Sequence, residues 1–319
     1  MDSTPKPNRK VAFVAWRRLS RRTTLMCKAL NVDLWFYTDR LPYLKAAFKT
    51  FAHVRKYRPS VLLIQLPQGP LLLQALLLRF LFGCRVIADV HTGFLMDWEW
   101  KSYFLNAPFR NLLSHADYIV IHNNTIKKLL SESAKRKALI VYDPWPYIDL
   151  STNQRDGDYL VFPASYHPDE PLKEILDCAR NNFPNVQLYV TGDWRRHPSV
   201  KQYESKKIVF TSYLSEKGYD DLISGARGII TGTKEEYTIL MSAWEAVAYK
   251  KPLAITKTLA LRDTYAEYPV YYDWKDQRSI SLAMQSLLSQ SQFKDNTALR
   301  EKVLQSMTEF KEKISLLLS

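Results

Sequence analysis

Short apolar runs alternate along the chain with segments of helical periodicity. The apolar runs have the length of buried strands and lie at 10–16, 33–37, 61–65, 85–89, 118–122, 138–142, 159–162, 186–190, 207–210, 228–230 and 252–255. Helical patterns lie between them, at 43–57, 71–82, 172–181, 217–224 and 238–249. Apolar strands that alternate with helices predict βαβ units and parallel sheets, so we expect an α/β fold.

The alternation is interrupted once, by a stretch rich in turn-forming residues. Two prolines at 143–146 and a polar run at 151–158 predict a linker there. We therefore expect an N-terminal Rossmann-like domain at 1–147 and a C-terminal one at 148–278. In open parallel sheets, ligands bind beyond the carboxyl ends of the strands. The tail at 279–319 is helical in pattern, and we expect it to pack back on the N-terminal domain.

Composition narrows the class of protein. The 319 residues are 46% hydrophobic and 24% charged, which is typical of a globular protein. No glycine-rich phosphate loop of either common spacing is present. Three widely spaced cysteines argue against a disulfide framework or a thiolate zinc site, and they fit a reducing cytosol. The longest apolar stretch, at 70–82, is too short to span a bilayer and fits a buried or an interfacial helix.

The net charge of +13 is carried by one half of the chain. Residues 1–150 hold 23 Lys and Arg against 10 Asp and Glu, whereas residues 151–319 hold 22 of each. A basic surface attracts phosphate-rich partners, such as nucleic acid, anionic lipid headgroups or lipid-linked phosphates. The alternative is a basic surface that only keeps the protein soluble. Because no nucleic-acid-binding signature accompanies the charge, we do not expect nucleic acid as a partner.

The strongest chemical signal lies at 231–256. A predicted strand ends at Ile230, a polar loop follows, and a helix is expected to begin near Thr238. The free N–H groups and the dipole at such a helix start favour a diphosphate. Glu245 lies about 10 Å further along this helix, within reach of the two hydroxyls of a ribose. The alternative is a capped helix with an exposed glutamate.

This stretch resembles the donor-site helix of GT-B glycosyltransferases. In those enzymes an acidic residue, seven intervening residues and a glutamate precede a small-residue run and Gly-x-Pro. Glu245 matches the second acid, and a Lys-Pro pair replaces the end of the motif. The first acid would fall on Tyr237, and the nearest acids are Glu236 and Glu235. The resemblance implies that Glu236, Tyr237, Thr238 and Glu245 contact the donor.

Further segments match in the same order. Those at 64–70, 87–94, 163–170 and 189–193 are similar to motifs of the dolichol-pathway β-mannosyltransferases, and 210–222 resembles a segment of the wider family-4-like superfamily. The resemblance implies a GT-B fold, with two Rossmann-like parallel-sheet domains facing a central cleft. It also implies a nucleotide-sugar donor, such as GDP-mannose or a UDP-sugar, on the C-terminal domain. The acceptor would then bind the N-terminal domain, and no cofactor is expected.

The arginine and lysine that grip the donor diphosphate in many such enzymes are absent. Ser165 and Glu170 stand near their expected positions. We therefore expect other residues of the C-terminal domain to contact the donor, namely Tyr166, Gly192, Asp193, Arg195 and Lys234, with Arg196 as an alternative.

Histidines at strand ends are candidates for proton transfer. His91 follows a strand that ends at Asp89 and precedes a glycine, which suits a general base or a sugar-binding imidazole. Asp89 is a rival catalytic carboxylate or a group that fixes the imidazole, and Asp97 is a second rival. His122, at another strand end, is expected to line the same cleft. The alternative for each histidine is a structural role.

Four arginines occur within six residues after the first strand. Arginine presents forked donors that suit phosphate, so Arg18, Arg21 and Arg22 are candidates for binding the acceptor or a phosphate. The alternative is a solvated basic loop. The D-x-D sequence at 156–158 precedes a strand instead of following one, so we interpret it as a turn. The histidines have no metal-ligand spacing, and no metal is expected.

The sequence thus predicts a metal-independent hexosyltransferase that is peripheral to the cytoplasmic face of a membrane. It would transfer a sugar from a nucleotide sugar to a lipid-linked or surface-glycan acceptor, by positioning and by stabilising the leaving diphosphate. Anionic lipid would be a further partner. The alternative is a catalytically degenerate GT-B subunit that binds a partner protein.

Overall fold

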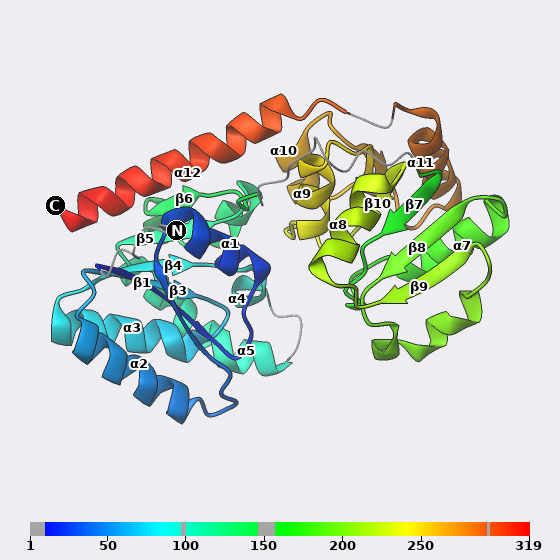
Figure 1. Ribbon diagram of the computed structural model, residues 1–319. Coiled ribbons are helices and arrows are strands. Elements are labelled where there is room, and N and C mark those ends of the chain that lie inside the picture. Colours follow the sequence, from blue (N-terminus) through cyan, green and yellow to red (C-terminus); the bar gives the residue numbers. More distant parts are fainter. Residues whose placement is uncertain (1–9, 97–99, 146–156, 292–293) are drawn as a thin grey trace, which may run out of the picture. The chain divides into compact units, whose positions relative to one another are not determined.

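The computed structural model describes residues 10–96, 100–145, 157–291 and 294–319 (Figure 1). The chain forms two compact units. The first runs to Pro144 and includes Lys302–Ser319, and the second is Trp145–Glu301. Each described unit is built on a parallel sheet of six strands, which confirms the predicted α/β class.

The first sheet has the strand order β2-β1-β3-β4-β5-β6, and all its pairings are parallel. Its strands are β1 (Val11–Trp16), β2 (Asp33–Tyr37), β3 (Val61–Gln65), β4 (Arg85–Asp89), β5 (Tyr118–Ile121) and β6 (Ala138–Ile140). The register places Asp89 beside Gln65 and Val120, so their side chains belong to the carboxyl edge of the sheet.

Helices connect these strands. They are α1 (Arg21–Leu30), α2 (Leu44–Tyr57), α3 (Gly69–Phe82), α4 (Thr92–Leu95), α5 (Trp100–Asn106), η1 (Ala107–His115), η2 (Thr125–Leu129) and α6 (Glu132–Lys135). Ser20 caps α1 by accepting a hydrogen bond from the backbone N–H of Thr23. Among the described residues, no helix combines the length and the apolar character needed to cross a membrane.

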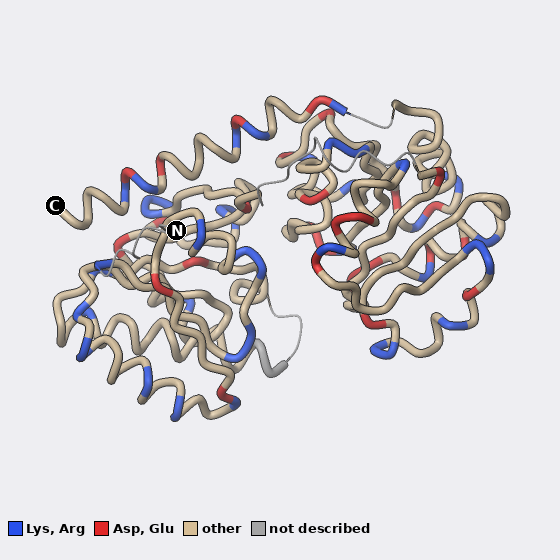
Figure 2. Tube along the Cα trace, viewed as in Figure 1, with Lys and Arg blue, Asp and Glu red and all other residues tan. Residues whose placement is uncertain are grey.

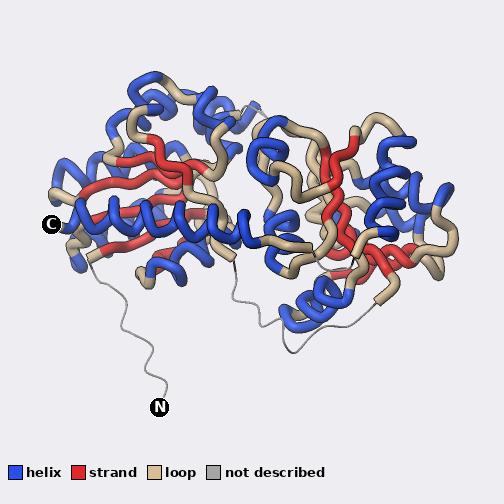
Figure 3. Tube along the Cα trace, turned by 90° about the horizontal axis from the view of Figure 1, so that it is seen from above, coloured by secondary structure: helices blue, strands red, loops and turns tan. Residues whose placement is uncertain are grey.

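A helix from the end of the sequence completes the core of the first unit. Helix α12 (Thr297–Leu318) lies across the strands of the first sheet, as Figure 3 shows. Its side chains Met307, Phe310 and Ile314 are buried with Phe13 and Met26 of the first unit. The expected helical tail at 279–319 is therefore divided, because α11 (Gln277–Ser289) belongs to the second unit.

The second sheet has the order β12-β11-β10-β7-β8-β9. Its strands are β7 (Tyr159–Phe162), β8 (Gln187–Thr191), β9 (Ile208–Ser212), β10 (Gly228–Ile230), β11 (Leu253–Thr256) and β12 (Val270–Tyr272). The chain runs from β7 outward to β9 and returns on the other side at β10, so the topological switch point lies between β7 and β10.

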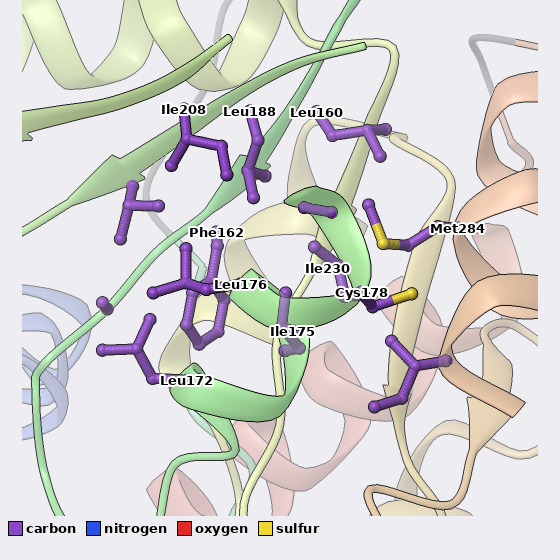
Figure 4. Packing of buried hydrophobic residues seen from close by; sticks show 14 of the residues in the cluster. Leu160, Phe162, Leu172, Ile175, Leu176, Cys178, Leu188, Ile208, Ile230 and Met284 are labelled. Carbon is purple, nitrogen blue, oxygen red and sulfur yellow. The ribbon is translucent and has the colours of Figure 1, made fainter. Parts of the chain in front are cut away.

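Helices cover both faces of this sheet. They are α7 (Leu172–Asn182), η3 (Trp194–Arg196), η4 (Pro198–Tyr203), α8 (Glu216–Gly225), α9 (Met241–Ala248), α10 (Leu259–Tyr265) and α11. Figure 4 shows the packing of α7 against the sheet, where Ile175, Leu176 and Cys178 meet Phe162 and Met284.

One sequence expectation is wrong, one strand was missed, and one expectation falls outside the described residues. Helix α9 begins at Met241 and not near Thr238, because the backbone is extended at its N-cap, Leu240. Strand β12 was not predicted. The linker predicted from the prolines and the polar run includes 146–156, which lies outside the described residues together with the first aspartate of the D-x-D sequence.

Candidate functional site

The carboxyl edge of the first sheet gathers a buried cluster of charged side chains. Arg22, on the inner face of α1, is only 5% exposed. Its Nε donates to Asp89 Oδ1 at 3.2 Å, and its Nη1 donates to Asp143, which follows β6. Its Nη2 is buried without a hydrogen-bond partner in the described part of the chain. Two carboxylates therefore contact one guanidinium, which leaves a local excess of one negative charge.

His91 lies against the second oxygen of Asp89. The two atoms His91 Nε2 and Asp89 Oδ2 are 3.3 Å apart, and the imidazole is partly exposed. Burial alone would raise the pKa of Asp89, but the charge of Arg22 and the hydrogen bond with His91 outweigh burial and lower this pKa to about 2. An ionised carboxylate can only accept, so Nε2 carries the proton and Nδ1 is left as the basic nitrogen.

His122 does not line an open site as predicted. It is buried after β5, and its Nε2 lies 3.2 Å from the hydroxyl of Thr92. Burial and the nearby charges of Arg22 and His91 lower the pKa of His122 to about 3. The imidazole therefore stays neutral at neutral pH and packs inside the fold, which corrects its assignment to the acceptor site.

The three candidate arginines have different environments. Arg22 is engaged by the two aspartates inside the fold, so two of its guanidinium nitrogens already have carboxylate partners. Arg21, the first residue of α1, is exposed, as is Arg18 in the preceding loop. The carbonyl oxygen of Arg18 accepts a hydrogen bond from Gln65 Nε2 at 2.8 Å, which ties this loop to the end of β3.

In the second unit, two loops flank the switch point between β7 and β10. The loop after β7 is braced by its own acids: Glu170 accepts from the backbone N–H groups of Ser165 and Tyr166. Asp169 joins it to the loop after β10, since its Oδ2 accepts from the hydroxyl of Thr233 at 2.5 Å. Burial raises the pKa of Glu170, although hydrogen bonds from Ser165 and Tyr166 oppose this rise.

Each of these loops carries a buried hydroxyl with no hydrogen-bond partner in the described part of the chain. These are the Oη of Tyr166 after β7 and the Oγ1 of Thr238 after β10, and both residues were predicted to contact the donor. Tyr166 has a left-handed backbone with φ of 59°, and its ring packs beside Gly192. A buried polar atom without a partner costs free energy, so these are positions at which a bound molecule or a water would supply the partner.

A pocket of about 250 Å³ adjoins the loop after β7. Tyr166 and Lys234, two of the predicted donor residues, line it together with Glu170, Glu174, Lys173 and His197. The Nζ of Lys234 is 3.1 Å from Glu174 and lies over the ring of Trp274, so its charge is already matched.

The predicted acids of the donor motif are both engaged. Glu245 on α9 is only 5% exposed and accepts from the Tyr219 hydroxyl at 2.5 Å, so the alternative of an exposed glutamate is wrong. Glu236 is exposed, and its carboxylate caps α10 by accepting from the backbone N–H of Leu259 at 2.8 Å. Tyr237 lies next to Glu236 in the segment between β10 and α9.

The loop after β8 carries the remaining predicted residues. Asp193 caps η3 and accepts from Arg195 Nε at 2.6 Å, so these two side chains are paired with each other. Arg196, the alternative to Arg195, donates from Nη1 to the carbonyl oxygen of Ser165 at 3.2 Å. Arg196 thus connects the loop after β8 to the loop after β7 at the switch point.

Sequence reasoning missed Asp143 and Asp169 as members of these sites. Asp143 follows an apolar strand, which is the position used to select His91 and His122, but the linker interpretation covered it. The described residues contain no group of three or more His, Cys, Asp or Glu side chains arranged to hold a metal ion.

No protein-family model matches the chain, and no curated protein matches its sequence. Solved structures match its fold. The lipopolysaccharide outer core galactosyltransferase WaaB, in its apo form, has a TM-score of 0.66 at 11% identity, covering 95% of this chain and 98% of that one. Anabaena HepE in complex with UDP and glucose has 0.69 at 8%, covering 94% and 99%. A glycosyltransferase from Rickettsia africae has 0.69 at 14%, covering 97% and 98%.

Proposed function

We propose that this chain, which has the GT-B fold of those structures, is a glycosyltransferase that uses a nucleotide-sugar donor. The observation that carries the proposal is the partly exposed His91, held through Nε2 on the ionised Asp89 at the carboxyl edge of the first sheet. Ligands of open parallel sheets bind at this edge. The acceptor binds here, and the donor binds the second unit.

The residues suit one proton transfer. His91 Nδ1 takes the proton from an acceptor hydroxyl as the acceptor oxygen bonds to the anomeric carbon of the sugar. The bond between that carbon and the nucleotide diphosphate breaks, and the diphosphate leaves with the electron pair. Asp89 holds the imidazole in the required tautomer and stabilises its charged form, and Arg22 keeps Asp89 ionised. Asp89 is therefore a positioning residue.

The donor half of the proposal rests on the switch point of the second sheet. The buried hydroxyls of Tyr166 and Thr238 have no hydrogen-bond partner in the described part of the chain, and Glu245 is positioned on α9 by Tyr219. HepE, a fold neighbour, is described in complex with UDP and glucose, which supports a nucleotide in this chain too. Gly192, Asp193, Arg195, Lys234, Glu236 and Tyr237 are proposed to lie around the bound donor.

The acceptor in this proposal is a lipid-linked sugar or a surface glycan at the cytoplasmic face of a membrane. Support comes from the basic charge of the first unit and from the motifs similar to dolichol-pathway β-mannosyltransferases. The transferred group is a hexose, and the reaction needs no metal ion or cofactor. Exposed Arg18 and Arg21 are proposed to bind phosphate of the acceptor.

A second function, a GT-B subunit that binds without catalysis, is favoured by one observation. Glu170 replaces a donor-gripping basic side chain and is used to brace its own loop. Such a subunit would retain the nucleotide site and lose transfer, so the two functions differ in a measurable way.

Thermal shift with UDP, GDP and their sugars tests the proposal, on the wild type and on Glu245→Ala. We expect one nucleotide to raise the melting temperature of the wild type and not that of the variant. If none of these ligands raises the melting temperature, the proposed enzymatic function is overturned. A nucleotide shift without release of the nucleoside diphosphate in the presence of lipid-linked glycans would support the binding subunit.

A further inference from the structure

Helices α2 and α3 lie side by side on one face of the first sheet. The Nε2 of Gln74 on α3 donates to the carbonyl oxygen of Ala47 on α2 at 2.6 Å. The rings of Phe51 and Phe82 are 5.7 Å apart, further along both helices. The two contacts advance in the same direction along both helices, so α2 and α3 run parallel and present one joint outer surface, and Figure 1 shows the two helices side by side.

The outer surface of α3 is apolar. Leu73, Leu77, Phe80 and Leu81 recur at helical spacing and are exposed, with Phe80 88% exposed. The opposite side of the same helix is buried in the core, and these four side chains do not belong to that buried side. A continuous exposed apolar strip on a soluble fold marks an interaction surface.

Helix α2 adds apolar side chains to the strip and cations beside it. Leu44 and Phe48 are exposed one turn apart, and Phe48 is 73% exposed. Exposed cations stand along the same helix at Lys45, Lys49, Arg55 and Lys56. We call these four cations and the six exposed apolar side chains the α2–α3 face.

Negative charge is sparse around these cations, and the acid nearest to them in the preceding sequence, Asp39, accepts from the backbone N–H of Ala46 at the start of α2. Residues 40–88 contain eight Lys and Arg and no Asp or Glu. Figure 2 shows the positive residues following one another along α2, whereas α3 is nearly free of charge. Apolar side chains beside an excess of cations complement a surface that has negative headgroups above an apolar interior.

We propose that the α2–α3 face docks on an anionic lipid bilayer. The six apolar side chains insert at the level of the headgroups and the upper acyl chains, and the four cations pair with anionic headgroups. A second copy of the chain fits less well, because pairing this face with itself would bring like charges together. The helices lie on the membrane surface with their apolar side down.

The docking also has a consequence for acceptor binding, and this part of the inference rests on the proposed function. Helices α2 and α3 start after the carboxyl ends of β2 and β3, so Leu44 and Phe48 belong to the end of the unit that carries Asp89 and His91. An acceptor anchored in the same bilayer would reach this edge with only its headgroup extended out of the membrane.

Vesicle co-sedimentation tests the docking on the full chain. The probes are vesicles of phosphatidylcholine alone and of phosphatidylcholine mixed with phosphatidylglycerol. We expect binding to the mixed vesicles only, weakening as salt shortens the Debye length from about 10 Å at 0.1 M to about 3 Å at 1 M. Lys45→Gln with Lys49→Gln should weaken binding roughly 30-fold. Leu77→Gln with Phe80→Gln should weaken it roughly tenfold or more.

Matched variants elsewhere serve as controls. Leu282→Gln with Leu304→Gln removes equally exposed leucines from α11 and α12, and Lys206→Gln with Lys207→Gln removes exposed lysines near β9. Both should bind vesicles as the wild type does. Equal losses in the controls, equal binding to both vesicle types, or no binding at low salt would each overturn the docking.

Two further measurements separate the alternatives. If light scattering shows a dimer that Leu77→Gln with Phe80→Gln converts to a monomer, the face is an interface between copies and the proposal is wrong. The nucleotide thermal shift is measured without vesicles on the same variants, and it should be unchanged. Vesicle binding without any nucleotide shift would reject the donor site alone, and the reverse result would reject the docking alone.

Discussion

Arg22 Nε donates to Asp89 Oδ1 at 3.2 Å, and both side chains are almost completely buried. This contact places one oxygen of Asp89 on a cation and leaves the other for His91. The Arg22 guanidinium therefore helps to keep Asp89 ionised, and Asp89 is also the carboxylate that contacts the proposed base, His91. Because Asp143 binds the same guanidinium, α1, β4 and the segment after β6 meet at one buried charge cluster.

Replacing Arg22 by methionine should destabilise the first unit strongly. Asp89 and Asp143 would remain buried without their cation, and breaking a buried ion pair in this way costs about 3–5 kcal/mol. Urea unfolding at neutral pH measures the loss. Arg21→Met, one residue earlier on the exposed side of α1, is the control and should change the free energy of unfolding by about 0.5 kcal/mol or less. Similar losses in both variants would contradict the buried cluster.

The burial of His122 predicts a pH dependence of stability. Its pKa is about 3 in the folded protein against 6.5 for the free side chain, so the unfolded chain binds more protons between these values. Stability from this group is complete above pH 6.5 and is lost as the pH falls toward 3. Between pH 7 and pH 5 the loss is about 2 kcal/mol.

His122→Gln should remove this loss, because glutamine keeps a polar atom near Thr92 and does not titrate. Urea unfolding at pH 7 and pH 5 compares the two proteins. The pKa of Asp89, about 2 in the folded state, keeps its own titration below this pH range. A variant that loses as much stability as the wild type over this range would show that His122 is not buried in the neutral form.

Removing the hydroxyl of Tyr166 or of Thr238 should weaken ligand binding and should not lower the stability of the fold. Tyr166→Phe and Thr238→Val break no hydrogen bond of the described residues, so we expect an unchanged or higher melting temperature without nucleotide. The shift produced by nucleotide should become smaller. Tyr272→Phe is the control, since its buried hydroxyl donates to Thr231 at 2.8 Å and its loss should cost about 1 kcal/mol. Lower stability of the first two variants would contradict a ligand-directed role.

Loss of the proposed base should separate binding from transfer. His91→Gln removes the ring nitrogen that would accept the proton, and we expect transfer to fall roughly 10²- to 10⁴-fold. The nucleotide shift should stay as in the wild type, because His91 belongs to the other unit from the donor residues. Release of the nucleoside diphosphate on addition of acceptor reports transfer. An unchanged rate would exclude His91 as the base.

The strands were predictable because each is a short apolar run between turn formers. β1 and β4 were located to within one residue, since both of their faces are covered. The start of α9 was not, because Thr238 is a favourable N-cap type, whereas the N-cap of the helix is Leu240, whose backbone is extended. Capping preference is local and is outweighed by the path of the loop.

The candidate site was predictable in part. The pairing of Asp89 with His91 follows from their spacing at one strand end, but the partner Asp143 is 121 residues from Arg22 in the sequence. No pattern in the sequence reports a contact at that separation. The burial of Arg22 was easier to predict from the sequence, because Arg22 shares a helical face with Met26, whereas Arg21 does not.

Helix α12 makes the first unit discontinuous in the sequence. During synthesis, the whole second unit leaves the ribosome before Met307, Phe310 and Ile314 are available to cover the first sheet. Part of the core of the first unit therefore stays uncovered until the second unit has been synthesised. A fragment that stops at Pro144 would need α12 supplied as a separate peptide, and a circular permutant that joins α12 directly to β1 would restore the unit in one piece.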